Sequence, residues 1–128
     1  MGAANVLFVC VHNAGRSQVS QLLFERRAGD HHSARSAGSN PADRVSPLVA
    51  RLYPELADRK PRKISRDDVR WADVVVTMGC GDECPYIPGK RYVDWQIPDP
   101  STKSTPEEID PIARLLSDHI DRLLKDLG

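Results

Sequence analysis

A cysteine, an arginine and a serine stand close together near the N-terminus, at a spacing that suits chemistry on an oxyanion. Five residues separate Cys10 from Arg16, and Ser17 follows directly. A loop of this length ahead of a helix turns several backbone N–H groups toward one point, where a negative charge is favoured. Arg16 adds a planar fork of donors for two oxygens of a tetrahedral anion. Because the same surroundings favour a thiolate over a thiol, we predict that Cys10 is a nucleophile.

The residues around Arg16 form the predicted oxyanion-binding loop. Gly15 lets the backbone turn closely, and Ser17 is expected to hydrogen-bond the sulfur and to donate to it when it leaves. The alternative is that Cys10 is a small buried apolar residue and Arg16 an ordinary surface residue. The position between a strand and a helix favours the functional interpretation, because that context supplies the N–H groups. The predicted loop comprises Val11, His12, Asn13, Ala14, Gly15, Arg16 and Ser17.

Strand and helix patterns alternate along the chain and place this loop at a strand end. The patterns predict strands over 5–11, 33–37, 72–78 and 91–96, helices over 17–27, 43–52 and 106–127, and a short helical turn over 65–69. This alternation is typical of an α/β protein, and we predict a four-stranded parallel sheet with helices on both faces. Ligands of such sheets bind beyond the carboxyl ends of the strands, where Cys10 is predicted to lie.

Length and charge limit the kinds of partner that are expected. A chain of 128 residues suits one domain, spanning 1–128. Eighteen basic residues balance eighteen acidic ones, so we predict neither a nucleic-acid nor a membrane partner. No apolar run approaches the ~20 residues that span a bilayer, and residues 1–10 do not resemble a secretory signal. We therefore expect a cytoplasmic protein. The chain has three cysteines, an odd number in a protein expected to be cytosolic, so we predict no structural disulfide framework. Catalytic, redox and metal-binding roles remain open for them.

The segment from Cys10 to Ser17 resembles the phosphate-binding loop of the low-molecular-weight protein tyrosine phosphatases, which has a cysteine, five residues, an arginine and a serine. Asn13 and the run from Arg16 to Gln18 are similar to the arsenate reductase branch of that superfamily, since the phosphatases usually carry proline after the serine. Residues 36–38 also resemble the family. The resemblance implies the phosphatase fold and reduction of arsenate, with phosphate and sulfate as oxyanion mimics.

Two further cysteines, Cys80 and Cys84, follow the predicted strand 72–78 and are expected at the same sheet edge as Cys10. Three thiols suit reduction of an arsenic oxyanion through an adduct and a disulfide relay. Resemblance to the thioredoxin-coupled reductases implies that Cys80 is the second thiol and Cys84 the third, with thioredoxin or another thiol reductant restoring the enzyme. The Cys80–Cys84 gap is shorter than in those relatives. A metal-binding pair assisted by His12 is a weaker alternative.

Asp99, before Pro100, completes the predicted site. Asp-Pro is a common turn, but the resemblance implies that Asp99 is the general acid that protonates the leaving oxygen. The resemblance also implies a potassium ion held by Asn13 and an acid at position 21. Gln21 is neutral, which leaves Ser36 and Asp67 as partners, and we assign no residue to a metal and predict no cofactor. The alternative functions are a tyrosine phosphatase using a Cys10 phosphocysteine and a non-catalytic oxyanion or thiol sensor.

Overall fold

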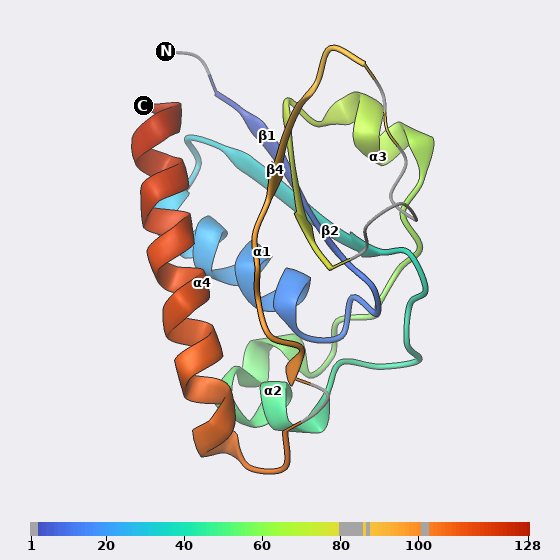
Figure 1. The fold of residues 1–128 in the computed structure, drawn as a ribbon, viewed down its shortest axis with the longest axis vertical. Coiled ribbons are helices and arrows are strands. Elements are labelled where there is room, and N and C mark those ends of the chain that lie inside the picture. Colours follow the sequence, from blue (N-terminus) through green and yellow to red (C-terminus); the bar gives the residue numbers. More distant parts are fainter. Residues whose placement is uncertain (1–2, 80–85, 87, 101–102) are drawn as a thin grey trace.

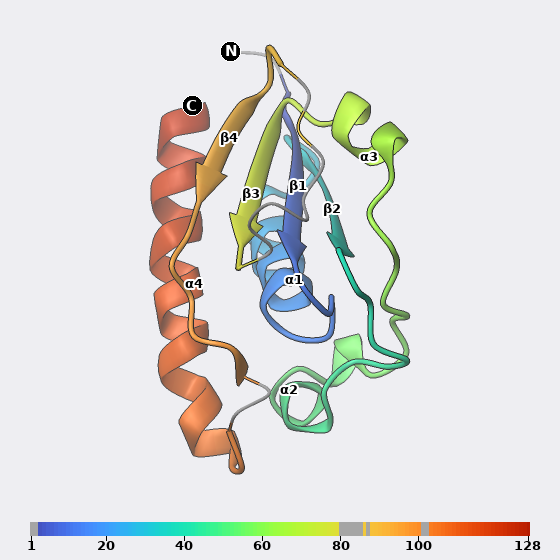
Figure 2. The same ribbon diagram turned by 45° about the vertical axis from the view of Figure 1, so that its right-hand side comes forward.

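Four short strands pair into one parallel sheet in the described part of the chain (Figure 1, Figure 2). The computed structural model describes residues 3–79, 86, 88–100 and 103–128. The strands, in sheet order, are β2 (Ser33–Gly38), β1 (Asn5–Cys10), β3 (Val74–Met78) and β4 (Arg91–Asp94), and every neighbouring pair is parallel. The predicted four-stranded parallel sheet is therefore confirmed.

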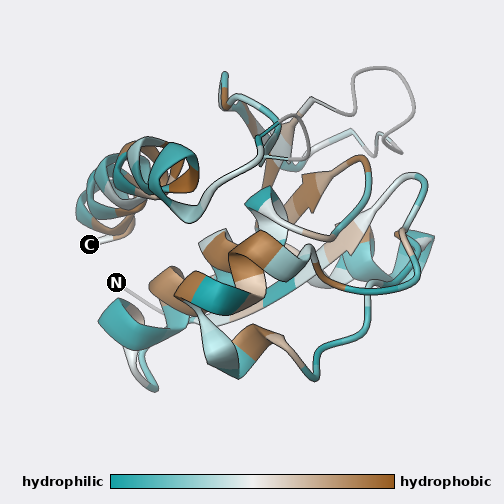
Figure 3. Cartoon of the chain, turned by 90° about the horizontal axis from the view of Figure 1, so that it is seen from below, coloured by the Kyte–Doolittle hydropathy of each residue, from teal (hydrophilic) through white to brown (hydrophobic). Residues whose placement is uncertain are grey.

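Helices cover both faces of this sheet, as predicted (Figure 2). Residues of α1 (Arg16–Ala28), α2 (Pro47–Leu52), a 3-10 turn (Pro54–Leu56) and α4 (Pro106–Leu127) pack on one face. The short α3 (Arg66–Trp71) packs on the other face through Val69. The apolar residues of α4 recur every three or four positions and face α1 and the sheet, while its hydrophilic residues face outward (Figure 3). No helix of the described ranges is long and apolar enough to cross a bilayer.

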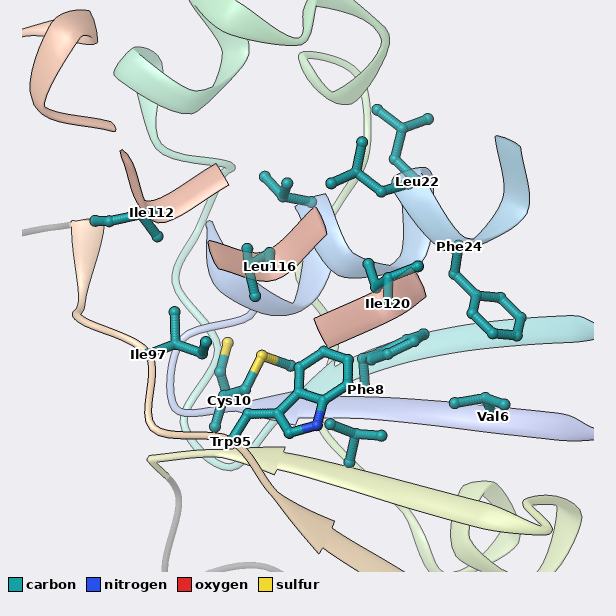
Figure 4. Packing of buried hydrophobic residues seen from close by; sticks show 14 of the residues in the cluster. Val6, Phe8, Cys10, Leu22, Phe24, Trp95, Ile97, Ile112, Leu116 and Ile120 are labelled. Atoms are coloured by element: carbon teal, nitrogen blue, oxygen red, sulfur yellow. The ribbon is translucent and has the colours of Figure 1, made fainter. Parts of the chain in front are cut away.

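The alternation of side chains along β1 decides which face receives the cysteine. Val6, Phe8 and Cys10 point into the larger core, whereas Leu7 and Val9 point toward α3. In the larger core the rings of Phe8 and Phe24 meet edge to face, with their centroids 5.6 Å apart (Figure 4). The sulfur of Cys10 therefore lies at the end of a strand that is buried from Val6 onward, on the side where α1 begins.

The largest difference from the sequence prediction concerns residues 43–46. The predicted helix 43–52 begins only at Pro47, because backbone N–H groups of the segment 40–46 are bonded to the loop after β1. The backbone N–H groups of Asn40, Ala42 and Ser46 donate to three carbonyl oxygens of that loop, at 2.8, 3.0 and 2.8 Å. Smaller differences are the later start of β3, the earlier end of β4 and the position of α3, which spans 66–71 where the sequence predicts 65–69.

Candidate active site

The sulfur of Cys10 lies beside a hydroxyl that is oriented by a second side chain. Cys10 is 2% exposed, and its Sγ lies 2.9 Å from Oγ of Ser17 in the first turn of α1. The same Oγ accepts a hydrogen bond of 2.7 Å from Nδ2 of Asn13. Because the amide occupies a lone pair of the hydroxyl, the hydroxyl proton is available to the sulfur. A hydroxyl proton in this position can stabilise negative charge on the sulfur, because a hydrogen bond to a charged acceptor is stronger than one to a neutral acceptor.

Asn13 has an unusual backbone conformation, and its side-chain oxygen, Oδ1, is held by two further hydrogen bonds. Its backbone φ is 51°, in the left-handed region that asparagine tolerates better than most residues. Its Oδ1 accepts hydrogen bonds of 3.1 Å from Nε2 of Gln18 and 3.1 Å from the backbone N–H of Arg62. Gly38, at the end of β2, lets the chains approach, since a Cβ there would lie 2.6 Å from the carbonyl oxygen of Val11. The loop is therefore fixed from both sides.

Arg16 faces the same site from the start of α1 and is held by segments that follow β3 and β4. Its NH1 donates 3.1 Å to the carbonyl oxygen of Ile97, and its NH2 lies 3.8 Å from Oδ2 of Asp99. Gly79, which follows β3, lies against the guanidinium: a Cβ there would come within 2.9 Å of NH1. Arg16 is 8% exposed, whereas the Asp99 side chain is 34% exposed. The acid is thus at the mouth of the site and the guanidinium is inside it.

A narrow pocket of about 30 Å³ joins these groups. One of its walls is Pro100, whose Cγ would lie 2.7 Å from a Cβ placed on Gly15. A volume of this size holds roughly two water molecules, which suits a small anion. No Phe, Tyr or Trp side chain is among the described residues that line it. The lining residues are Cys10, His12, Ala14, Gly15, Arg16, Ser46, Asp99 and Pro100.

The structure thus brings most of the sequence-predicted residues to one point. The loop, Arg16 and Ser17 surround Cys10, and Asp99 lies within reach of the guanidinium. Cys80 and Cys84 lie outside the described residues. Sequence reasoning did not assign Ser46 or Pro100 to the pocket. Pro100 could have been suspected from its place after Asp99, whereas nothing in the sequence around Ser46 marks it.

The region beside Asn13 does not suit the potassium ion that the sequence resemblance implies. Oδ1 of Asn13 already accepts two hydrogen bonds, and Oε1 of Gln21 accepts one of 2.7 Å from Ser36. The Asp67 side chain is 87% exposed and pairs with Arg70 instead. No cluster of three His, Cys, Asp or Glu side chains that could hold a metal occurs in the described ranges. One buried acceptor beside Asn13, Oε1 of Gln18, has no hydrogen-bond partner among the described residues, so the group offers a cation one free oxygen and not a full set of ligands.

Comparison with known proteins agrees with this geometry. Residues 5–128 match the family described as low molecular weight phosphotyrosine protein phosphatase, and the chain belongs to that family. An arsenate reductase of Halalkalibacterium halodurans is 30% identical over 129 residues, which cover 94% of this chain and 91% of the relative.

Two solved structures are similar over nearly the whole chain. A thioredoxin-dependent arsenate reductase of Corynebacterium glutamicum is 38% identical with a TM-score of 0.81, covering 98% of this chain and 62% of that one. This chain therefore spans less than two thirds of that relative's length. An arsenate reductase of Archaeoglobus fulgidus is 31% identical with a TM-score of 0.77, covering 94% and 98% of the two chains.

Proposed function

We propose that this protein reduces arsenate to arsenite, with Cys10 as the nucleophile. The observation that carries the proposal is the sulfur of Cys10 at 2.9 Å from Ser17, in a pocket of oxyanion size that Arg16 and Asp99 also line. The arsenate reductases among its relatives give the choice of oxyanion. Residues 1–128 act as a single catalytic domain in this proposal, and the cytoplasm, which keeps thiols reduced, is the compartment in which it works.

The first step forms a bond between sulfur and arsenic. The thiolate of Cys10 attacks As(V) while the loop N–H groups and Arg16 hold the other oxygens. One As–O bond breaks, and Asp99 protonates the departing oxygen so that water leaves. Ser17 stabilises the thiolate before the attack through its hydrogen bond. No electron pair has yet passed to arsenic at this point, so the adduct is still at the As(V) level.

The second step reduces arsenic. The thiolate of Cys80 attacks Sγ of Cys10, an S–S bond forms, and the S–As bond breaks with its electron pair remaining on arsenic, which leaves as arsenite. Cys84 then attacks Cys80, which moves the disulfide to Cys80–Cys84 and returns Cys10 as a thiolate. Both downstream cysteines lie outside the described residues. The contact between Arg16 and Gly79, the residue before Cys80 in sequence, supports this assignment.

An external thiol reductant completes the cycle. A dithiol protein of the thioredoxin class reduces the Cys80–Cys84 disulfide and is itself oxidised, so the net reaction consumes two thiols for each arsenate. The thioredoxin dependence stated for the Corynebacterium glutamicum relative supports this donor class. Phosphate and sulfate, which share the tetrahedral shape, bind the pocket without being reduced.

A phosphatase acting through a Cys10 phosphocysteine is the competing function, since it needs the same nucleophile, arginine and acid. The pocket lining favours the reductase, because its described residues include no Phe, Tyr or Trp side chain to receive the ring of a phosphotyrosine. Such a phosphatase would have no use for Cys80 or Cys84.

A thiol count separates the two functions. The fully reduced protein has three thiols, and incubation with arsenate without reductant should consume two of them, while phosphate should consume none. The Cys84→Ser variant should stop at a Cys10–Cys80 disulfide, which peptide mass analysis identifies. An unchanged thiol count with arsenate, together with hydrolysis of an aryl phosphate by a Cys80→Ser/Cys84→Ser variant, would establish the phosphatase instead.

A further inference from the structure

A second pocket, of about 370 Å³, opens between α1, β2 and the segment 59–62. It has more than ten times the volume of the pocket at Cys10 and shares none of its lining residues. The volume falls within the range of sites that bind small organic molecules. Its lining residues are Gln18, Gln21, Arg35, Ser36, Arg59, Lys60 and Arg62.

The charge around this pocket is strongly unbalanced. Four of its seven lining side chains are cations, and only two carboxylates pair with them. Asp68 is shared by Arg35 and Arg62, and Glu25 pairs with Arg59 at 3.1 Å. No described acidic residue pairs with Lys60. Two positive charges therefore remain in excess around one cavity, an arrangement that repels a cation and attracts an anion.

Two of the guanidinium groups are already held in place. The Arg35 guanidinium lies over the Trp71 ring, 4.2 Å from its centre, where a cation–π interaction stabilises its position. Arg62 donates 2.9 Å to the carbonyl oxygen of Ser36 and also bonds the buried carboxylate of Asp68. Groups that are fixed before binding lose little conformational freedom when a ligand arrives. Their planar forks match the oxygen pairs of phosphoryl groups.

We propose that this pocket binds a diphosphate group, as inorganic pyrophosphate or as the diphosphate of a nucleotide. The four cations form two pairs. Arg35 and Arg62 share the carboxylate of Asp68, and Arg59 and Lys60 are consecutive residues, so each phosphoryl group of a diphosphate can be bound by one pair. The excess of two positive charges matches a multivalent anion better than a monovalent one. This site is independent of the arsenate chemistry proposed for Cys10, and its test does not require turnover.

The test is a calorimetric titration with pyrophosphate, and with ADP as a second probe, at one fixed low salt concentration. The Arg16→Met variant weakens anion binding at Cys10, so that one pyrophosphate per chain should remain in the second pocket. Adding Arg59→Gln and Lys60→Gln should weaken that binding at least tenfold. The matched control adds Arg51→Gln and Lys125→Gln, which removes the same charges from exposed positions outside the pocket and should change the affinity by less than twofold.

The wild-type protein provides a second measurement if the buried Arg16 cannot be replaced without unfolding. It should bind at least one pyrophosphate per chain, and its Arg59→Gln/Lys60→Gln variant should bind one fewer. Binding of pyrophosphate or ADP with this pattern supports the site, and the tighter probe identifies the source of the diphosphate. The same number of sites in the wild type and in this variant, or equal weakening by the control substitutions, would overturn the proposal, because the attraction would then not depend on the cations of this pocket.

Discussion

Removing the hydroxyl of Ser17 tests whether the structure stabilises a thiolate at Cys10. Ser17→Ala deletes the partner that lies 2.9 Å from the sulfur and leaves the loop backbone, Arg16 and the rest of α1 in place. The same substitution removes the acceptor of the 2.7 Å hydrogen bond that Nδ2 of Asn13 donates to Oγ of Ser17. The variant therefore has two separable effects, one on the reactivity of the sulfur and one on the stability of the fold.

Both effects have a magnitude that follows from the geometry. A hydrogen bond to a charged group contributes about 1.5–3 kcal/mol, so the rate at which the Cys10 sulfur is alkylated at one fixed pH should fall about 10- to 100-fold in Ser17→Ala. The buried amide donor of Asn13 is left without a partner, which should lower the free energy of unfolding by about 1–3 kcal/mol. The rate of alkylation by iodoacetamide measures the first effect, and urea unfolding measures the second.

Ser20→Ala is the matched control, because Ser20 is also a fully buried serine of α1. Its Oγ donates 2.7 Å to the backbone carbonyl of Arg16 and lies 3.6 Å from the sulfur of Met78. This substitution should leave the alkylation rate of Cys10 within twofold of wild type. If Ser17→Ala also leaves that rate within twofold, the hydroxyl does not stabilise negative charge on the sulfur and the reasoning from the 2.9 Å contact is wrong.

Three further predictions concern the surroundings of the site. Asp68→Asn removes the charge of a carboxylate that is 1% exposed and should lower the free energy of unfolding in urea by about 2–4 kcal/mol. Asp67→Asn, at a side chain that is 87% exposed, should lower it by under ~1 kcal/mol, and similar losses in the two variants would show that burial does not decide the cost. Gly38→Ala puts a Cβ 2.6 Å from a carbonyl oxygen of the anion-binding loop, so sulfate affinity should fall at least tenfold with the circular dichroism retained; unchanged affinity would refute this. Burial, reinforced by His31, lowers the pKa of His32 below its usual 6.5, so the unfolded state takes up the proton first and stability should fall as the pH drops below about 6.5. His32→Gln should flatten that slope in urea unfolding, and an equal slope would exclude His32 as its source.

The order and type of the main elements could be predicted because each has a strong local pattern. The run from Val6 to Cys10 is apolar at every position, as a strand buried on both faces requires, and α4 repeats its apolar residues at helical spacing over 22 residues. Residues 43–46 were predicted wrongly as helix for the opposite reason. Their conformation is decided by hydrogen bonds to a loop that is 30 residues distant in sequence, and no local pattern reports such bonds.

The site was predictable to the extent that one segment contains it. Cys10, Arg16 and Ser17 are neighbours in sequence, and their roles follow from a strand, a loop and a helix in succession. The supports of Asn13 were not predictable, since Arg62 reaches it through a backbone N–H that any residue type except proline could provide. The roles assigned to Asp99 and to the two downstream cysteines stay predictions until the variants are measured.

The outward bonding of the loop supports the anion binding that we propose for this chain, whose basic and acidic residues are equal in number. The N–H and C=O of a peptide unit point in opposite directions, so a loop whose carbonyls turn outward directs its N–H groups inward. Segment 40–46 provides the hydrogen-bond partners for these outward-facing carbonyls, because three of its N–H groups donate to the carbonyl oxygens of Val11, His12 and Ala14. The loop thereby becomes a concave set of donors without any additional basic residue, and Arg16 needs to supply only the charge that the oxyanion requires. Anion binding at Cys10 should therefore depend more on the integrity of segment 40–46 than on the net charge of the protein.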